Sequence, residues 1–164
     1  TVVVDLKRLR RWRELDRDKM TLTVETGTIG IRLEEELQAK GLTVGHFPSS
    51  ILCSTVGGWI AGRGAGQCSG RYGKIEDMVA NIEVVTGRGD VTTVHRRIHG
   101  PDLVPLFVGS EGVLGLMTSA KLRLHTNPTH RCYVAMAFPT MKAGYETIRT
   151  IYQQGLRPAV CRRW

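Results

Sequence analysis

Two glycine-rich segments hold the residues whose types and spacing suit the binding of a large anionic cofactor. The first, Pro48–Gly66, mixes small hydroxyl residues with glycines, and the second is Gly109–Gly115. Glycine lets the backbone approach a ligand closely, and backbone N–H groups at such turns bind phosphate. Either segment alone could serve only as a turn. Because both occur in one small domain, we predict that they bind one cofactor.

The residue order in the first segment predicts a short helix followed by a flat loop. Ser54 and Thr55 are typical helix N-caps. Gly57 and Gly58 would leave that turn bare, so that a phosphate or a ring could approach exposed backbone N–H groups. We expect a short helix around 58–61. The glycines that follow suit a backbone that lies flat against a planar ligand, and they are Gly62, Gly64 and Gly66.

Several motifs, in the same order along the chain, resemble the FAD-linked oxidases of the vanillyl-alcohol oxidase type. They are Thr55–Trp59, Arg71–Val79 and Gly100–Gly115. Within that family, Gly45–Pro48 and Ser54–Trp59 are most similar to the alkylglycerone-phosphate synthases and their bacterial relatives. The resemblance covers residues 1 to about 160, which is nearly the whole chain.

The resemblance implies a domain that binds FAD noncovalently in an α+β fold. In the family the flavin lies between two subdomains, and no pyrophosphate loop precedes residue 48 here. Residues 1–126 are therefore expected to form the second subdomain of the FAD-binding domain, a mixed or antiparallel sheet with flanking helices, with the first subdomain missing. Asn127–Pro128 reads as a boundary. Residues 127–164 are expected to begin a truncated C-terminal cap domain.

The resemblance also implies which residues contact FAD. Residues of the first turn would face the diphosphate and ribityl portions, the next loop would pass beside the isoalloxazine, and the second segment would clamp the adenosine end through backbone groups. The expected FAD-binding residues are Pro48, Ser49, Ser50, Ser54, Thr55, Gly57, Gly58, Gly62, Arg63, Gly64, Ala65, Glu111, Gly112, Val113, Leu114, Gly115, Leu116 and Met117. Catalytic residues stay unassigned, because the family keeps them in the cap domain.

For the other ionisable residues near these segments, we favour structural roles over catalytic or flavin-tuning roles. Arg63 could place positive charge near the flavin pyrimidine edge, but a surface or phosphate-side arginine is the favoured interpretation. Glu76 and Asp77 look like paired carboxylates for acid–base chemistry, yet a capping role fits their place after a Tyr-Gly turn better. For His46 we expect a loop hydrogen bond rather than catalysis.

Composition narrows the class of protein further. The chain has 164 residues, enough for one domain with a tail. No apolar run approaches the ~20 residues of a membrane-spanning helix, and no signal-peptide pattern opens the chain. The cysteines show no metal-ligand spacing, so we expect no metal, reduced thiols and a cytoplasmic protein. Expected partners are FAD and a small-molecule substrate, with a homodimer for the full-length protein.

The formal net charge of +8 is concentrated partly in Lys7–Arg13. Clustered Lys and Arg could neutralise nucleic-acid phosphates. No nucleic-acid-binding motif and no further basic stripe accompany the cluster, so we expect no nucleic-acid partner. We interpret Lys7–Arg13 as a solvated turn after a first strand at Thr1–Leu6.

The hydrophobic pattern predicts strands and helices without regular β-α alternation, hence an α+β fold. A helix at 31–40 would place Glu34, Glu35 and Glu36 outward, and Gly41 would end it. Gly87–Asp90 predicts a hairpin turn between strands at 82–85 and 91–94. Further strands are expected at 22–25, 42–44, 116–124, 132–138 and 158–164, and further helices at 102–107 and 140–154.

These observations favour the FAD-binding portion of a flavin-dependent oxidoreductase that acts on a small alcohol or a 2-hydroxy acid. The alternative is a redox-neutral FAD-dependent transferase like alkylglycerone-phosphate synthase, which would share this domain. A noncatalytic basic interaction domain that kept the fold and lost the cofactor is the rival from another class. The two intact glycine-rich segments argue against that rival.

Overall fold

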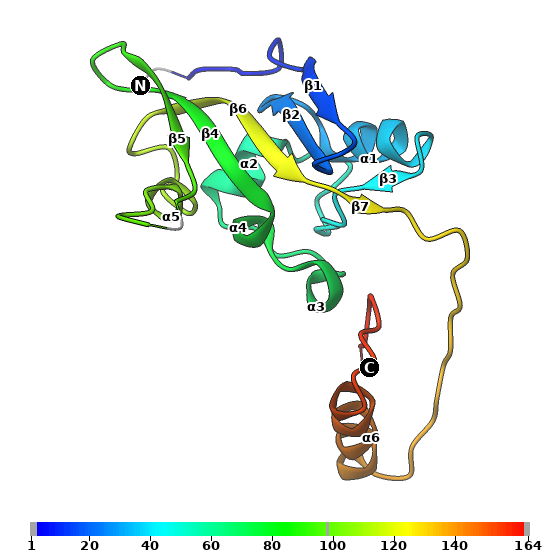
Figure 1. Ribbon diagram of the computed structural model, residues 1–164. Coiled ribbons are helices and arrows are strands. Elements are labelled where there is room, and N and C mark those ends of the chain that lie inside the picture. Colours follow the sequence, from blue (N-terminus) through cyan, green and yellow to red (C-terminus); the bar gives the residue numbers. More distant parts are fainter. Residues whose placement is uncertain (1–2, 98, 163–164) are drawn as a thin grey trace.

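The computed structural model, which describes residues 3–97 and 99–162, is built around an antiparallel sheet of five strands in the order β1-β2-β6-β4-β5. Figure 1 shows these strands crossing the upper part of the molecule. A two-stranded antiparallel sheet, β3-β7, continues from one end. The strands are β1 Trp12–Asp16, β2 Thr21–Glu25, β3 Leu42–Thr43, β4 Val79–Val85, β5 Val91–His95, β6 Leu116–Arg123 and β7 His125–Thr126.

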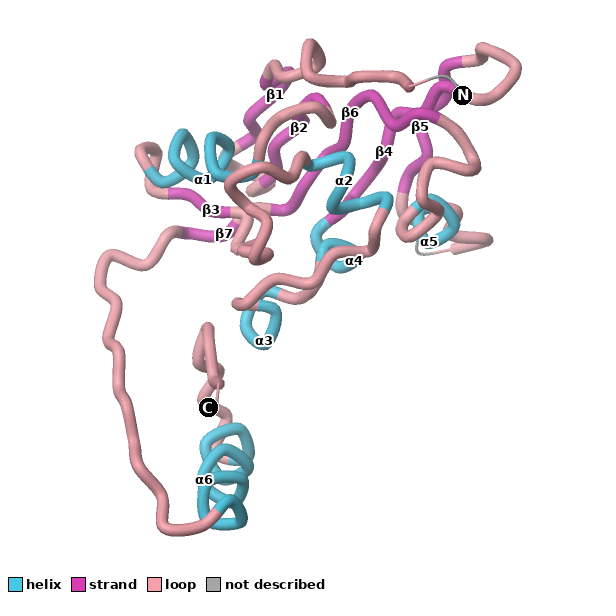
Figure 2. Tube along the Cα trace, turned by 180° about the vertical axis from the view of Figure 1, so that it is seen from behind, coloured by secondary structure: helices cyan, strands magenta, loops and turns pink. Residues whose placement is uncertain are grey.

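Short helices cover one face of the main sheet. Figure 2, seen from behind, shows α1, α2 and α4 in front of the strands. An antiparallel sheet covered on one side is expected to alternate apolar and polar residues. In β2 the buried Leu22 and Val24 alternate with the half-buried Thr21 and Thr23. The helices are α1 Gly30–Gln38, α2 Val56–Ala61, α3 Ser69–Tyr72, α4 Ile75–Met78, α5 Val104–Phe107 and α6 Met141–Gln153.

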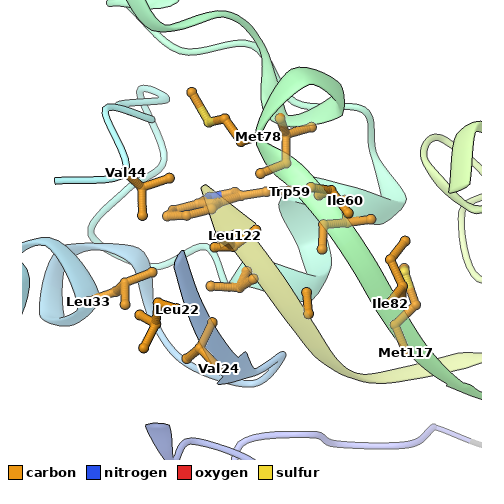
Figure 3. Packing of buried hydrophobic residues seen from close by; sticks show 14 of the residues in the cluster. Leu22, Val24, Leu33, Val44, Trp59, Ile60, Met78, Ile82, Met117 and Leu122 are labelled. Carbon is orange, nitrogen blue, oxygen red and sulfur yellow. The ribbon is translucent and has the colours of Figure 1, made fainter. Parts of the chain in front are cut away.

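The core lies between this helical layer and the sheet. Trp59 of α2 is 3% exposed and lies in the middle of the cluster in Figure 3, close to Val44 and Leu122. Burying an aromatic side chain of this size contributes about 2–3 kcal/mol or more. The position of α2 against the sheet is therefore fixed by its core side chains, and the segments on either side of α2 are fixed with it.

The expected α+β class is confirmed, and most predicted elements are present. The helix predicted at 31–40 is α1, and Gly41, with a φ of +75°, follows it as expected. The hairpin around Gly87–Asp90 joins β4 to β5. The orientation expected for Glu34 is wrong: its side chain is fully buried, because it shares the inner face of α1 with Leu33 and Leu37.

The N-terminal prediction is also wrong. Residues 3–6 form no strand, and Val3 and Val4 are 86% and 53% exposed; residues 1 and 2 lie outside the described part. The first strand is instead Trp12–Asp16, within and beyond the basic cluster. Three consecutive valines favour a strand only where another strand pairs with them, and β2 pairs with Trp12–Asp16.

Lys7 and Arg8 form an exposed turn, as expected, whereas Arg11 and Arg13 lie next to carboxylates. The Arg11 N–H donates to the Glu25 carboxylate at 2.9 Å. The Arg13 guanidinium lies 3.5 Å from Glu25 and 2.9 Å from Glu83. Glu25 is 1% exposed, and its burial opposes the charged form, yet the Arg11 N–H and the two guanidinium groups outweigh it and lower the pKa of Glu25. Part of the positive charge therefore compensates a buried carboxylate.

The C-terminal part differs from prediction except for its helix. Thr140 caps α6, as the predicted helix at 140–154 requires. The strand expected at 132–138 is absent, and residues 158–162 form no strand; residues 163 and 164 lie outside the described part. Figures 1 and 2 show this segment leading away from the sheet to α6, where no other strand lies beside it. Without a partner strand, backbone pairing cannot form.

Candidate cofactor-binding site

The two glycine-rich segments meet at one groove, which has a volume of about 300 Å³. One side is the outer face of α2, and the other is the end of the second segment with the start of β6. This glycine groove is lined by Leu6, Gly57, Gly58, Ala61, Gly62, Glu111, Gly112, Gly115, Leu116 and Met117. Segments more than forty residues apart in the sequence thus form one surface, as the sequence predicted for a shared ligand.

Thr55 starts α2 as an N-cap, because its hydroxyl accepts from the Gly58 N–H at 3.2 Å. The neighbouring N–H groups are also paired: Val56 donates to the carbonyl oxygen of Thr28, and Gly57 donates to that of Thr26 at 2.8 Å. The prediction that this turn exposes free N–H groups is therefore wrong. The first turn of α2 is held by its cap and by the preceding loop, and it offers bare Cα surface rather than N–H donors.

Glycine creates that surface on the face of α2 that lines the groove. Gly58 and Gly62 are one helical turn apart, and a Cβ atom at Gly58 would meet only the Thr55 hydroxyl, at 3.4 Å. Across the groove, a Cβ atom at Gly112 would have no neighbour within 4 Å. Three positions on opposite walls therefore leave room for a flat group to lie directly against the backbone.

The second segment is bonded to the C-terminal end of α2. The Gly109 N–H donates to the Ile60 carbonyl oxygen at 2.9 Å, and the Glu111 N–H donates to that of Ala61 at 3.1 Å. These bonds satisfy carbonyl groups that the helix leaves unpaired. Arg63 and Glu111 both have a φ near +50°, in the left-handed region. Such backbone strain gathers at binding sites, where the surrounding structure holds it in place.

Several residues expected to bind FAD lie outside the groove lining. They lie in the chain just before α2, just after α2, and in the middle of the second glycine-rich segment. They are Pro48, Ser49, Ser50, Ser54, Thr55, Arg63, Gly64, Ala65, Val113 and Leu114. Ser49 and Ser50 are exposed, whereas the Ser54 hydroxyl accepts from the Trp59 indole N–H at 2.8 Å. Leu6 and Ala61 line the groove but were missed, because neither has a chemistry that the sequence could have marked.

Arg63, Glu76 and Asp77 have structural partners. Arg63 forms an ion pair with Glu76, which joins the 62–66 loop to α4. Asp77 accepts from the Lys74 N–H at 2.8 Å, which is the capping role favoured by the sequence. The paired carboxylates thus stabilise the chain around the loop.

His46 lies beneath the 62–66 loop. It is fully buried, and its ring packs edge-on against Trp59 with centroids 4.7 Å apart. Neither ring nitrogen has a hydrogen-bond partner among the described residues, so the expected loop hydrogen bond is wrong. Burial lowers the pKa of His46 to about 4. The imidazole is therefore neutral at physiological pH, with polar atoms next to the loop still unpaired.

An antiparallel sheet whose helical face carries a glycine-lined groove defines a cofactor-binding α+β domain. A family model described as "FAD binding domain" matches residues 1–95 of this chain. The chain belongs to that FAD-binding family. The groove suits a part of a dinucleotide, because its volume is near the lower end for ligand pockets and its glycines admit a flat group.

Curated and solved relatives agree with this family. The chain is 36% identical over 162 residues to alkyldihydroxyacetonephosphate synthase from Trypanosoma brucei brucei, covering 98% of this chain and 26% of the relative. It is 32% identical to glycolate oxidase subunit GlcD from Bacillus subtilis (strain 168), covering 96% and 34%. A solved alkyldihydroxyacetonephosphate synthase superposes with a TM-score of 0.81 at 32% identity, covering 95% and 28%. The chain thus spans about a quarter to a third of these relatives.

None of the helices in the described residues is both long enough and apolar enough to cross a membrane. No three of the described His, Cys, Asp or Glu side chains gather where they could hold a metal ion. The groove itself is lined by glycines, apolar residues and one acidic residue, Glu111.

Proposed function

We propose that this chain supplies the FAD-binding part of a flavin-dependent oxidoreductase that acts on a small alcohol or a 2-hydroxy acid. The observation that carries the proposal is the meeting of both glycine-rich segments at the glycine groove. The likeness to a glycolate oxidase subunit supports the substrate class, since glycolate is a 2-hydroxy acid. A bound flavin supplies hydride acceptance, and the protein orients it.

A second candidate is a redox-neutral, FAD-dependent transfer like that of the alkylglycerone-phosphate synthases. It is supported by the 36% identity to the trypanosomal alkyldihydroxyacetonephosphate synthase, a name for the same type of enzyme, and by the TM-score of 0.81. Both candidates need the same groove. A substrate screen on the full-length protein separates them: reduction of the flavin by a 2-hydroxy acid supports the first, and formation of an alkylated product without net reduction of the flavin supports the second.

The proposed FAD contacts are those inferred from the sequence, with the groove residues at their centre. We place the noncovalent cofactor along residues 48–50, 54–55, 57–58, 62–65 and 111–117 and add Leu6 and Ala61 at the groove walls. In this proposal residues 1–126 form the FAD-binding unit and 127–164 belong to a cap domain. A boundary near this point is supported by the course of the chain, which leads away from the sheet after Asn127, whose N–H still bonds to the Gly41 carbonyl oxygen.

We also propose a cytoplasmic protein that forms a homodimer and binds no nucleic acid. The four cysteines, spaced neither for metal nor in Cys-x-x-Cys pairs, support a reducing compartment. The ion pairs of Arg11 and Arg13 with Glu25 and Glu83 support the absence of nucleic acid, because the two carboxylates offset part of the charge of the basic cluster. Fractionation of the source cells and light scattering of the full-length protein test compartment and dimer.

The proposed site is tested by Gly58→Val in the full-length protein. A side chain there has space within the protein but would fill the groove, so we expect a folded protein that loses FAD. Gly87→Val is the matched control, because Gly87 is exposed in the β4–β5 turn and has no neighbour within 4 Å of a Cβ position. Unchanged FAD content in Gly58→Val would contradict the site.

A further inference from the structure

The Glu34 carboxylate is buried, and no cationic side chain among the described residues forms an ion pair with it. Its side chain is fully buried on the inner face of α1. Oε1 accepts from the backbone N–H groups of Val44 and Gly45 at 3.0 and 3.1 Å. Oε2 accepts from the Thr43 hydroxyl at 2.6 Å. Burial raises the pKa of Glu34 against these hydrogen bonds, so this carboxylate occupies its place at an energetic cost.

The hydrogen bonds of Glu34 fix the turn Thr43–Gly45. The Gly45 N–H is shared between the Glu34 carboxylate and the Thr43 hydroxyl, the latter at 2.9 Å. Gly45 has a φ of +78°, and a Cβ atom there would lie 2.4 Å from the Tyr72 ring. The turn is therefore enclosed between α1 on one side and an aromatic ring on the other, with a backbone conformation that few other residues adopt.

The segment that follows this turn, His46–Phe47, supports the 62–66 loop. A Cβ atom at Gly64 would lie 3.3 Å from His46 Nε2, and one at Gly66 would lie 2.6 Å from the Phe47 nitrogen. The Gln67 N–H donates to the Phe47 carbonyl oxygen at 2.8 Å. The loop thus rests directly on His46–Phe47, and a shift of the turn would move the loop by contact rather than through a chain of flexible side chains.

We propose that Glu34 is a positioning residue for the flavin-facing 62–66 loop, acting through the turn Thr43–Gly45 and the His46–Phe47 segment. It binds neither cofactor nor substrate itself. The inference rests on the proposed function, since the 62–66 loop is where that proposal places the isoalloxazine. The inference adds Glu34 of α1, which lies outside both glycine-rich segments, to the residues that shape the proposed FAD site.

A purely stabilising role for Glu34 makes a different prediction. Glu34→Leu leaves the Val44 N–H and the Thr43 hydroxyl without their acceptor, so we expect it to lower stability in either case. With a purely stabilising role, the folded protein would still bind FAD with the wild-type affinity and spectrum. A positioning role predicts instead that the fold survives while the cofactor loses its exact setting.

The test uses four variants of the full-length protein, with FAD affinity, the visible flavin spectrum and the apoprotein melting temperature as readouts. Glu34→Leu removes both carboxylate oxygens that accept hydrogen bonds from the turn. Glu34→Gln keeps Oε1 for both N–H groups and can donate to Thr43 from its amide. Leu37→Ala destabilises the same helix without touching the carboxylate, and Glu36→Leu changes an exposed carboxylate of that helix.

We expect Glu34→Leu to weaken FAD binding about tenfold or more and to shift the flavin spectrum, on the scale seen when a supporting hydrogen bond at a bound group is lost. Glu34→Gln should restore the wild-type spectrum and affinity, and Glu36→Leu should match wild type. Should Glu34→Leu not fold, Thr43→Val is expected to shift the spectrum in the same direction, because it removes the hydroxyl that donates to Glu34 and accepts from the Gly45 N–H.

Two results would overturn the inference alone. The first is wild-type FAD affinity and spectrum in Glu34→Leu, or in Thr43→Val if Glu34→Leu does not fold. The second is a loss of FAD affinity in Leu37→Ala equal to that in Glu34→Leu when the two variants have the same melting temperature. A wild-type protein that does not bind FAD would instead refute the proposed function, and this inference with it. The two failures are thus distinguished by the wild-type measurement.

Discussion

The Gly57 N–H donates to the carbonyl oxygen of Thr26 at 2.8 Å, and Thr26 leaves Gly57 no room for a side chain. A Cβ atom at Gly57 would lie 2.9 Å from the Thr26 Cβ. Thr26 also donates its hydroxyl to the Met117 carbonyl oxygen at 2.6 Å. Thr26, directly after β2, therefore sets the distance between α2 and β6, which carry the two walls of the glycine groove.

Gly57→Ala is predicted to destabilise the protein by about 1–3 kcal/mol, the usual cost of forcing a methyl group into a packed site. Gly58→Ala is the matched control, because its Cβ would have a nearest contact of 3.4 Å. Urea unfolding of both variants measures the difference. Equal stability of the two would show that the contact between Thr26 and Gly57 does not limit the approach of α2.

Arg13→Gln is predicted to lower stability by about 2 kcal/mol, because Glu25 stays buried with one cation fewer. Arg10→Gln should have almost no effect, since Arg10 is exposed and exposed charges contribute little. Thermal unfolding of the two variants at the same pH gives the comparison. A loss as large in Arg10→Gln would mean that the basic cluster acts through its total charge rather than through Glu25.

His46 predicts a specific pH dependence. Its pKa is lowered from 6.5 to about 4 in the folded chain by burial, so between these values the unfolded state binds the proton more readily. Stability is then full above pH 6.5, falls as pH drops toward about 4 by up to about 1.4 kcal/mol per unit, and levels off below.

His46→Phe should remove this slope. Glu34, whose pKa is raised by burial, gives the opposite slope above 4.5 in both proteins and so cancels in their difference. Denaturant unfolding across this pH range measures that difference. Identical pH profiles for wild type and His46→Phe would show that His46 is not held neutral by the fold.

Arg63→Met is predicted to change the flavin reduction potential by less than about 30 mV, which equals about 1.4 kcal/mol for a two-electron couple. The reason is that Glu76 already compensates the Arg63 guanidinium, and Arg63 does not line the groove. Potentiometric titration of both proteins provides the measurement. A much larger fall would show that the guanidinium turns to the flavin and stabilises its reduced form.

Sequence patterns correctly predicted features that depend on neighbouring residues in the chain, such as helix caps and turns. They missed features that depend on a segment distant in the sequence, such as the pairing of an edge strand. Thr55 as a cap and the turn Gly87–Asp90 depend on neighbours in sequence, and both were found. The strand at Trp12–Asp16 was missed because it lies at the sheet edge with charged residues on both faces. Only its pairing with β2 reveals it.

Glu34 could have been recognised from the sequence. Gly30, Leu33, Glu34 and Leu37 follow the spacing of one helical face, which is the face that the structure buries. Three successive glutamates suggested a solvated surface instead. No sequence pattern could have predicted that the His46 ring lacks a hydrogen bond. Trp59 and the 62–66 loop, which are distant from His46 in the sequence, enclose the ring.

The most direct test of the central claim is the cofactor content of the purified full-length protein. The protein is denatured, and the released small molecule is identified by mass spectrometry and quantified by its flavin absorbance. We predict intact FAD in an amount equal to the protein, released without proteolysis because it is held noncovalently. A colourless protein that takes up no added FAD would contradict the account.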